Sequence, residues 1–204
     1  MAVFGNDHLP YEYDKSEQYT TSDFPHLHEM VNKTLELLHE NNENGFFLMV
    51  ECGRIDHAGH ANNIPRLIYE CIECDRTFQY IKQYTLAHAE DTLTIVTADH
   101  ETGGLTVNRD NGVGKLADVS WGTSGHTDSN VNIYAFGDWA KWLNDKEIDN
   151  EEVFKLSFYG NGNGEDILDL NFNDEYFLVN SACTSSINIM IMLILCFIIV
   201  IFSM

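Results

Sequence analysis

The chain has 204 residues, of which 44% are hydrophobic, and a formal net charge of −21 from 32 acidic and 11 basic residues. This length suits one domain with a sizeable core, and the hydrophobic fraction excludes a disordered polymer. The acidic balance argues against nucleic-acid binding, which needs a basic footprint. It also argues against attraction of an anionic substrate by the whole surface, so such a substrate would need bound cations to reverse the local field.

Apolar spacing predicts alternating helices and strands along the chain. Residues 1–23 are predicted to form a loop. Helices are predicted over residues 25–41, 64–84 and 148–156, and strands over residues 46–50, 92–97 and 131–136. Pro65 suits the first turn of the second helix. Long helical patterns between strands indicate an α/β fold in which at least part of the sheet is parallel.

Candidate metal ligands follow the first two predicted strands. Glu51 ends the first strand, and Asp56 and His60 come next, four residues apart, so that on a helical turn they point to the same side. Asp99 and His100 lie just past the end of the second strand. Because ligand sites in α/β sheets gather beyond the carboxyl ends of strands, a two-metal hydrolytic site is the first hypothesis.

Each of these signals is ambiguous when it is taken alone. Asp56 could be a helix-start carboxylate beside an incidental histidine, and Asp99 could be a helix cap. His126, in a loop rich in glycine, serine and threonine, adds a third weak signal. Five other histidines are interpreted as surface or helix histidines without a role: His8, His26, His28, His39 and His88.

Five cysteines are present, and an odd number gives no clean disulfide framework. Cys71 and Cys74 have the spacing of a redox or zinc motif. They lack a second pair and fall within a helical pattern, so we interpret them as cysteines that pack the helix.

The end of the chain has a composition of its own. Residues 181–186 are small and polar, and residues 187–202 are almost wholly apolar. A membrane-spanning helix needs ~20 apolar residues, and no Lys or Arg follows this run. Small residues before an apolar tail are typical of a cleaved lipid-anchor signal, although the polar spacer is shorter than the usual ~8 residues. We favour the lipid anchor over a retained membrane helix, and the sequon at Asn32 would then be usable.

Taken together, the motifs resemble the C-terminal half of alkaline phosphatases. The resemblance lies in three segments in the family's order, residues 47–60, 97–104 and 123–127, and extends to residues 4–11 and 148–154. It therefore covers about residues 3–156. Three separate metal-binding motifs in one order make it specific.

The resemblance implies a metal-dependent hydrolase of phosphate monoesters that forms a phosphoserine. It implies six metal ligands: Asp56, His60 and His126 for a first zinc, Asp99 and His100 for a second zinc, and Glu51 for magnesium. These donor types agree with the chemistry of the ions, because nitrogen and carboxylate ligands suit zinc and a hard carboxylate suits magnesium. In such a site one zinc lowers the pKa of the serine or of water, and the other stabilises the leaving oxygen.

The chain also departs from the family pattern. The Asp-Ser-Ala motif of the nucleophile does not occur in it, and the bridging aspartate, the hydroxyl ligand of magnesium and the phosphate-clamping arginine are missing, since Arg54 does not match the clamp. Cys52 takes the place of a small glycine, which we interpret as tighter packing. We therefore expect the first zinc site to be complete, the other two sites to be incomplete, and this polypeptide alone to lack phosphatase activity.

The predicted organisation follows from these segments. Residues 1–156 are interpreted as the C-terminal part of an alkaline-phosphatase-like domain, an incomplete α/β fold with a central sheet flanked by helices. Residues 157–186 are an acidic and then polar linker, and residues 187–204 a hydrophobic tail, either an anchor signal or a membrane segment. The resemblance implies a homodimer, and the tail implies attachment to the outer face of the cell membrane.

Three alternatives stay open at this point. A sulfatase or phosphodiesterase of the same superfamily would share the scaffold, although the Gly103-Gly104 segment and the context of His126 and Thr127 favour the phosphatase. A non-enzymatic acidic surface protein derived from the enzyme is a second possibility. The third, which we favour, is that the sequence is an incomplete piece of a longer gene product.

Overall fold

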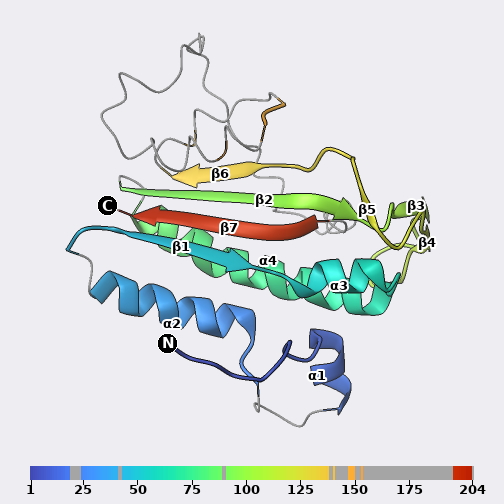
Figure 1. Cartoon of the computed structure of the whole chain (residues 1–204), viewed down its shortest axis with the longest axis horizontal. Coiled ribbons are helices and arrows are strands. Elements are labelled where there is room, and N and C mark those ends of the chain that lie inside the picture. Colours follow the sequence, from blue (N-terminus) through green and yellow to red (C-terminus); the bar gives the residue numbers. More distant parts are fainter. Residues whose placement is uncertain are drawn as a thin grey trace.

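The computed structural model describes residues 1–18, 24–40, 43–88, 91–137, 140, 147–149, 153 and 195–203. The helices are α1 (Glu12–Gln18), α2 (Leu27–Glu40), α3 (Arg54–His60) and α4 (Ile64–Ala87). The strands are β1 (Phe46–Glu51), β2 (Thr92–Thr102), β3 (Thr106–Arg109), β4 (Asp118–Ser120), β5 (His126–Thr127), β6 (Tyr134–Gly137) and β7 (Leu195–Ser203). The longer helices gather on one side of the main sheet, and β3 and β4 form a separate two-stranded sheet at one end (Figure 1).

The two long predicted helices are confirmed as α2 and α4. The side chain of Asn63 accepts a hydrogen bond from the backbone N–H of Arg66 at 3.1 Å, which caps α4, and Pro65 lies in its first turn as expected. The predicted third helix falls mostly outside the described residues.

The expectation of a loop over residues 1–23 is wrong for α1, because part of that stretch is helical. Contacts with α4 hold this helix in place. The backbone N–H of Glu12 donates to the carboxylate of Glu70 at 2.7 Å, and Arg66 forms an ion pair of 3.1 Å with Asp14. These partners are more than 50 residues away in the chain, so local sequence gave no sign of them.

The main sheet has the order β1-β7-β2, with β5 and β6 both pairing with β2. All the strand pairs of the described residues are antiparallel, which contradicts the expected parallel pairing. The physical reason is simple: β1 and β2 do run in the same direction, as a strand–helix–strand unit requires, but β7 lies between them and is antiparallel to both.

Strand β7 comes from the apolar end of the chain. In the register of the sheet, Val200 is paired with Met49 of β1 on one side and with Ile95 of β2 on the other. Residues 195–203 are therefore part of the sheet, whereas the sequence had suggested a tail outside the domain. Among the described residues, none of the helices combines the length and the apolar character needed to cross a membrane.

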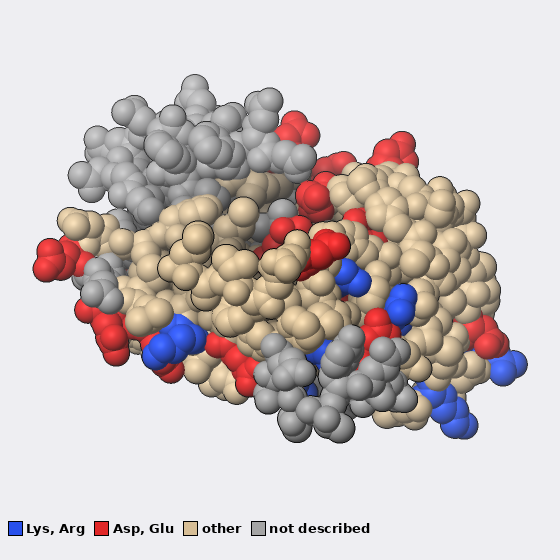
Figure 2. Space-filling view, turned by 60° about the horizontal axis from the view of Figure 1, so that its bottom comes forward, with Lys and Arg blue, Asp and Glu red and all other residues tan. Residues whose placement is uncertain are grey.

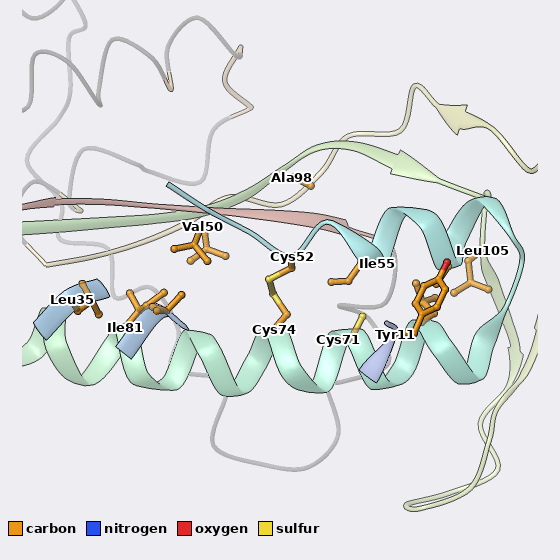
Figure 3. Close-up of a cluster of buried hydrophobic side chains, with 14 residues drawn as sticks. Tyr11, Leu35, Val50, Cys52, Ile55, Cys71, Cys74, Ile81, Ala98 and Leu105 are labelled. Atoms are coloured by element: carbon orange, nitrogen blue, oxygen red, sulfur yellow. A yellow bond between two sulfur atoms is a disulfide. The ribbon is translucent and has the colours of Figure 1, made fainter. Parts of the chain in front are cut away.

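Strand β2 is buried on both faces and organises the packing. On the helix side, Val96 and Ala98 belong to the larger core, which α2, α3 and α4 share (Figure 3). The Thr94 hydroxyl lies 2.7 Å from that of Thr85 on α4. Ile95 belongs to a smaller cluster beside β6. Alternate residues of β2 thus belong to different clusters, in agreement with the two-residue period of a strand.

A disulfide joins Cys52, just after β1, to Cys74 on α4 (Figure 3). The interpretation of Cys74 as a packing cysteine, and of Cys52 as a packing substitution, is therefore wrong. Cys71 is buried in the larger core, as expected of a packing cysteine. The bond fixes the segment that leads from the sheet into α3.

Candidate metal centre

Helix α3 presents Asp56 and His60 on one side. Its other side is buried through Ile55, Ala58 and Gly59. Gly59 packs closely on β2, since a Cβ atom at this position would lie 3.1 Å from Cγ2 of Thr102. The absence of a side chain at Gly59 thus lets α3 approach the strand that carries the other predicted ligands.

Three predicted ligands converge at one point. Nε2 of His60 lies 3.3 Å from Oδ1 of Asp56, Nε2 of His126 lies 3.7 Å from the same oxygen, and the two nitrogens are 3.1 Å apart. Ligands held ~2.0–2.1 Å from a tetrahedral zinc ion are separated by about 3.3 Å. Asp56, His60 and His126, called here the first ligand group, therefore have the spacing of three of four zinc ligands.

Hydrogen bonds orient the members of the first ligand group. Nδ1 of His60 donates to the backbone carbonyl of Ser124 at 2.6 Å, so in the neutral ring this contact selects the tautomer whose Nε2 can bind a metal. The hydroxyl of Thr102 donates to Oδ1 of Asp56 at 2.7 Å. Such outer contacts fix the tautomer and the direction of metal ligands. Sequence reasoning missed both residues, and Ser124 carries no signal because it acts through its backbone.

His100 lies directly beside the first ligand group. Its ring stacks on that of His126 with centroids 3.5 Å apart, and its Nδ1 lies 3.1 Å from the hydroxyl of Thr102. Nε2 of His100 lies 3.3 Å from Oδ2 of Asp99. Contrary to expectation, both residues lie within β2, where the register against β7 shifts between Ala98 and Glu101. A register shift of this kind re-aims side chains, as bulges beside active sites do.

Glu51 lies apart from these residues. It ends β1 with an exposed side chain, and its carboxylate lies over Gly53, where a Cβ atom would be 3.2 Å from Oε1. In the part of the chain that is described, neither Glu51 nor Asp99 is among the residues whose ligand atoms converge with those of Asp56. The role of Glu51 as a magnesium ligand stays a prediction.

Hydrogen bonds to Glu101 hold β5, the strand that carries His126, against β2. The buried carboxylate of Glu101 accepts hydrogen bonds from the backbone N–H of Gly104, at 2.9 Å, and from the hydroxyl of Thr127. Gly103 has a φ of +98°, and a Cβ atom there would meet the ring of Trp121 at 2.6 Å. Sequence reasoning quoted this segment but missed the part that Glu101 plays in holding β5 against β2.

His57 lies between the two ligands of α3 in sequence, but its ring contacts another histidine. The ring of His8 meets it edge-on at 4.4 Å. Burial lowers the pKa of His57, and the nearby His8 and Arg54 lower it further. His57 is therefore neutral over a wider pH range than an ordinary histidine.

Two imidazoles and a carboxylate at this spacing define a candidate zinc centre of the kind found in metal-dependent hydrolases. A model of the alkaline phosphatase family matches residues 1–115, more than half of the chain. The chain belongs to the alkaline phosphatase family. The matched range contains all the predicted ligands except His126.

Several known proteins are similar to parts of the chain. The repressible alkaline phosphatase of Saccharomyces cerevisiae is 37% identical over 114 residues, which are 53% of this chain and 19% of that protein. The tissue-nonspecific isozyme of Homo sapiens is 45% identical over 76 residues, 37% of this chain and 14% of that protein. A solved structure of a TAB5 alkaline phosphatase mutant with magnesium in its M3 site matches 54% of this chain and 34% of its own, with 28% identity and a TM-score of 0.49.

The chain spans about a fifth of the length of the curated relatives in Saccharomyces cerevisiae and Schizosaccharomyces pombe. The similarity to these relatives therefore concerns only a part of their fold.

Proposed function

We propose that this chain is the zinc-holding part of an alkaline phosphatase that hydrolyses phosphate monoesters through a phosphoserine. The observation that carries the proposal is the convergence of Asp56, His60 and His126 within 3.1–3.7 Å in a chain of this family. Zinc bound there would supply a Lewis acid and lower the pKa of a bound oxygen.

Different residues of the chain would hold different metal ions. The first ligand group would hold one zinc, with Thr102 and Ser124 orienting its donors. His100 and Asp99 would hold a second zinc, and their 3.3 Å separation suits two ligands of one ion. Glu51 would hold magnesium, as the family resemblance implies.

A phosphate monoester is an anion, and the chain has a net charge of −21. Acidic side chains are spread over the face shown in Figure 2, with Lys and Arg at several places among them. The cations at the ligand groups would therefore attract the substrate locally. Nucleic acid is an unsuitable partner for the same electrostatic reason.

The serine, the bridging aspartate and the clamping arginine of the family would come from a further part of the fold. We propose that this chain alone does not hydrolyse phosphate monoesters and that the complete protein is a homodimer at the outer face of the cell membrane. A lipid anchor in residues 187–204 would compete with the pairing of β7, since one segment cannot serve both.

Zinc titration of the purified chain by calorimetry tests the ligand group. We expect His60→Ala to remove one equivalent of bound zinc, because His60 supplies one of three convergent donors. His39→Ala, a change of an exposed histidine on α2, is the matched control and should remove none. Equal zinc binding by His60→Ala and the unaltered chain would contradict the proposal.

Hydrolysis of p-nitrophenyl phosphate at alkaline pH tests whether the nucleophilic serine comes from another part of the protein. The zinc-loaded chain alone is expected to show no turnover, because it lacks the nucleophilic serine. Turnover by the purified chain that His60→Ala abolishes would overturn the assignment of the serine to another part of the protein.

A further inference from the structure

A second group of imidazoles and carboxylates lies where α1, the start of α2 and α4 meet. Ligand atoms of Glu12, His26 and Glu73 all lie within 4.8 Å of one another. We propose that Glu12, His26 and Glu73, called here the second ligand group, bind a divalent transition metal such as zinc. The group shares no residue with the first ligand group.

The donor atoms of the second ligand group face inward. Nδ1 of His26 lies 2.6 Å from Oε2 of Glu12. Beside them, Nδ1 of His28 lies 2.7 Å from Oε1 of Glu73, and the two imidazole rings stack with centroids 5.6 Å apart. Imidazole nitrogen and carboxylate oxygen together suit zinc and its neighbours in the transition series, whereas calcium and magnesium prefer oxygen alone.

Burial of its two carboxylates makes this arrangement different from a surface cluster of charges. The side chains of Glu12 and Glu73 are 12% and 6% exposed, that of the neighbouring His28 is 15% exposed, and that of His26 is 39% exposed. A buried carboxylate is costly unless cations or hydrogen-bond donors compensate it. Lys15 and Arg76 supply part of this compensation. The backbone N–H of His28, which donates to Oε1 of Glu73 at 2.9 Å, supplies another part, and a divalent cation between the two carboxylates would add to it.

Cationic side chains hold the outer oxygen of each carboxylate. Nζ of Lys15 lies 2.6 Å from Oε1 of Glu12, and Arg76 lies 3.4 Å from Oε2 of Glu73. The other oxygen of each carboxylate therefore faces the histidines. This is the outer support that orients metal ligands in proteins.

The competing description is a pair of histidine–carboxylate hydrogen bonds without a metal. In that case each Nδ1 must carry a proton, whereas a bound metal replaces a proton on His26. The two descriptions differ in what the chain binds, so a binding measurement separates them. The interpretation of His26 as a surface or helix histidine without a role anticipated neither the hydrogen bond to Glu12 nor a bound metal.

Zinc binding by the full chain provides the test, with calorimetry giving stoichiometry and the d–d absorption of cobalt(II) giving the ligand environment. We expect two equivalents that are lost separately, one by His26→Gln and the other by His60→Ala, and none in the double variant. Glu73→Gln, which keeps its size and its hydrogen-bonding oxygen, serves as a second probe if His26→Gln does not fold. His39→Ala is the control.

Each outcome bears on one site or the other. Unchanged zinc and cobalt binding by both His26→Gln and Glu73→Gln, with circular dichroism showing folded variants, overturns the second ligand group and leaves the first intact. A single equivalent that His26→Gln removes and His60→Ala retains supports this inference and overturns the proposed function.

Discussion

The two ligand groups differ most in the surroundings of their carboxylates. In the first, Asp56 is 18% exposed and accepts a hydrogen bond from the neutral hydroxyl of Thr102, and the side chains of His60 and His126 are 38% and 49% exposed. In the second, His26 is 39% exposed, but Glu12 and Glu73 are 12% and 6% exposed, and each has one oxygen beside a cationic side chain, Lys15 or Arg76. Similar donors thus suit different tasks: two exposed imidazoles suit an ion that a substrate can reach, whereas two enclosed carboxylates suit an ion that joins helices.

The disulfide connects the surroundings of both groups. Cys52 precedes the helix that carries Asp56, and Cys74 follows Glu73 on α4. Changing both cysteines to alanine should lower the free energy of unfolding by about 3 kcal/mol, given the separation of 22 residues. It should weaken zinc binding at both groups. Urea unfolding gives the energy.

The control for this experiment is reduction. Dithiothreitol should lower the unfolding midpoint of the unaltered chain and leave that of the double alanine variant unchanged. A midpoint of the unaltered chain that does not respond to the reductant would contradict the structural role of the bond.

Glu70 offers a way to change the helices near the second group without substituting a ligand. Burial raises the pKa of Glu70 to about 7, although the hydrogen bond from the backbone N–H of Glu12 lowers this pKa; the charge of the Glu12 carboxylate raises it to a smaller extent. The folded chain therefore holds this proton more tightly than the unfolded chain. The resulting stability is full below the ordinary pKa of ~4.5 and is lost as the pH rises through about 7.

Glu70→Gln should therefore match the unaltered chain near pH 4 and exceed its stability by roughly 2 kcal/mol at pH 8. Glutamine keeps an oxygen that accepts the N–H of Glu12. Urea unfolding in buffer with a chelator measures the difference free of metal effects, and Glu36→Gln on the exposed side of α2 is the control. A difference that does not vary with pH would refute the expectation.

The change with the smallest expected effect, Thr102→Val, concerns zinc binding at the first group alone. Thr102→Val removes the hydrogen bond to Asp56 and should weaken zinc binding at the first group about 10-fold, as losses of outer contacts commonly do. Measuring it in a His26→Gln background isolates the first group. Thr106→Val, on exposed β3, is the control. Equal weakening of zinc binding by Thr102→Val and Thr106→Val would point to a general loss of structure.

The sequence predicted the parts of the fold that repeat locally. Apolar spacing located α2 and α4, and the short apolar run before Glu51 located β1. Asp56 and His60 were predictable because four residues separate them on one helix. His126 gave a weak signal through its loop, and only the family resemblance grouped it with Asp56 and His60, since it reaches them from 66 residues away in the chain.

What the sequence did not predict depends on distant partners. Helix α1 is held by residues of α4, and the Cys52–Cys74 bond joins different elements. Glu73 meets His28 from 45 residues away, so no short motif contains the second ligand group. Thr102 contributes a single hydroxyl to Asp56, which no spacing rule identifies.

Strand β7 has a consequence for how the chain meets copies of itself. It pairs with all of β1 and with most of β2, so it covers one edge of each of these strands. A chain that ended before Leu195 would present two rows of unpaired N–H and C=O groups at the centre of its sheet. Such edges are templates for strands of other molecules, so the pairing of β7 removes two places where a foreign strand could add to the sheet.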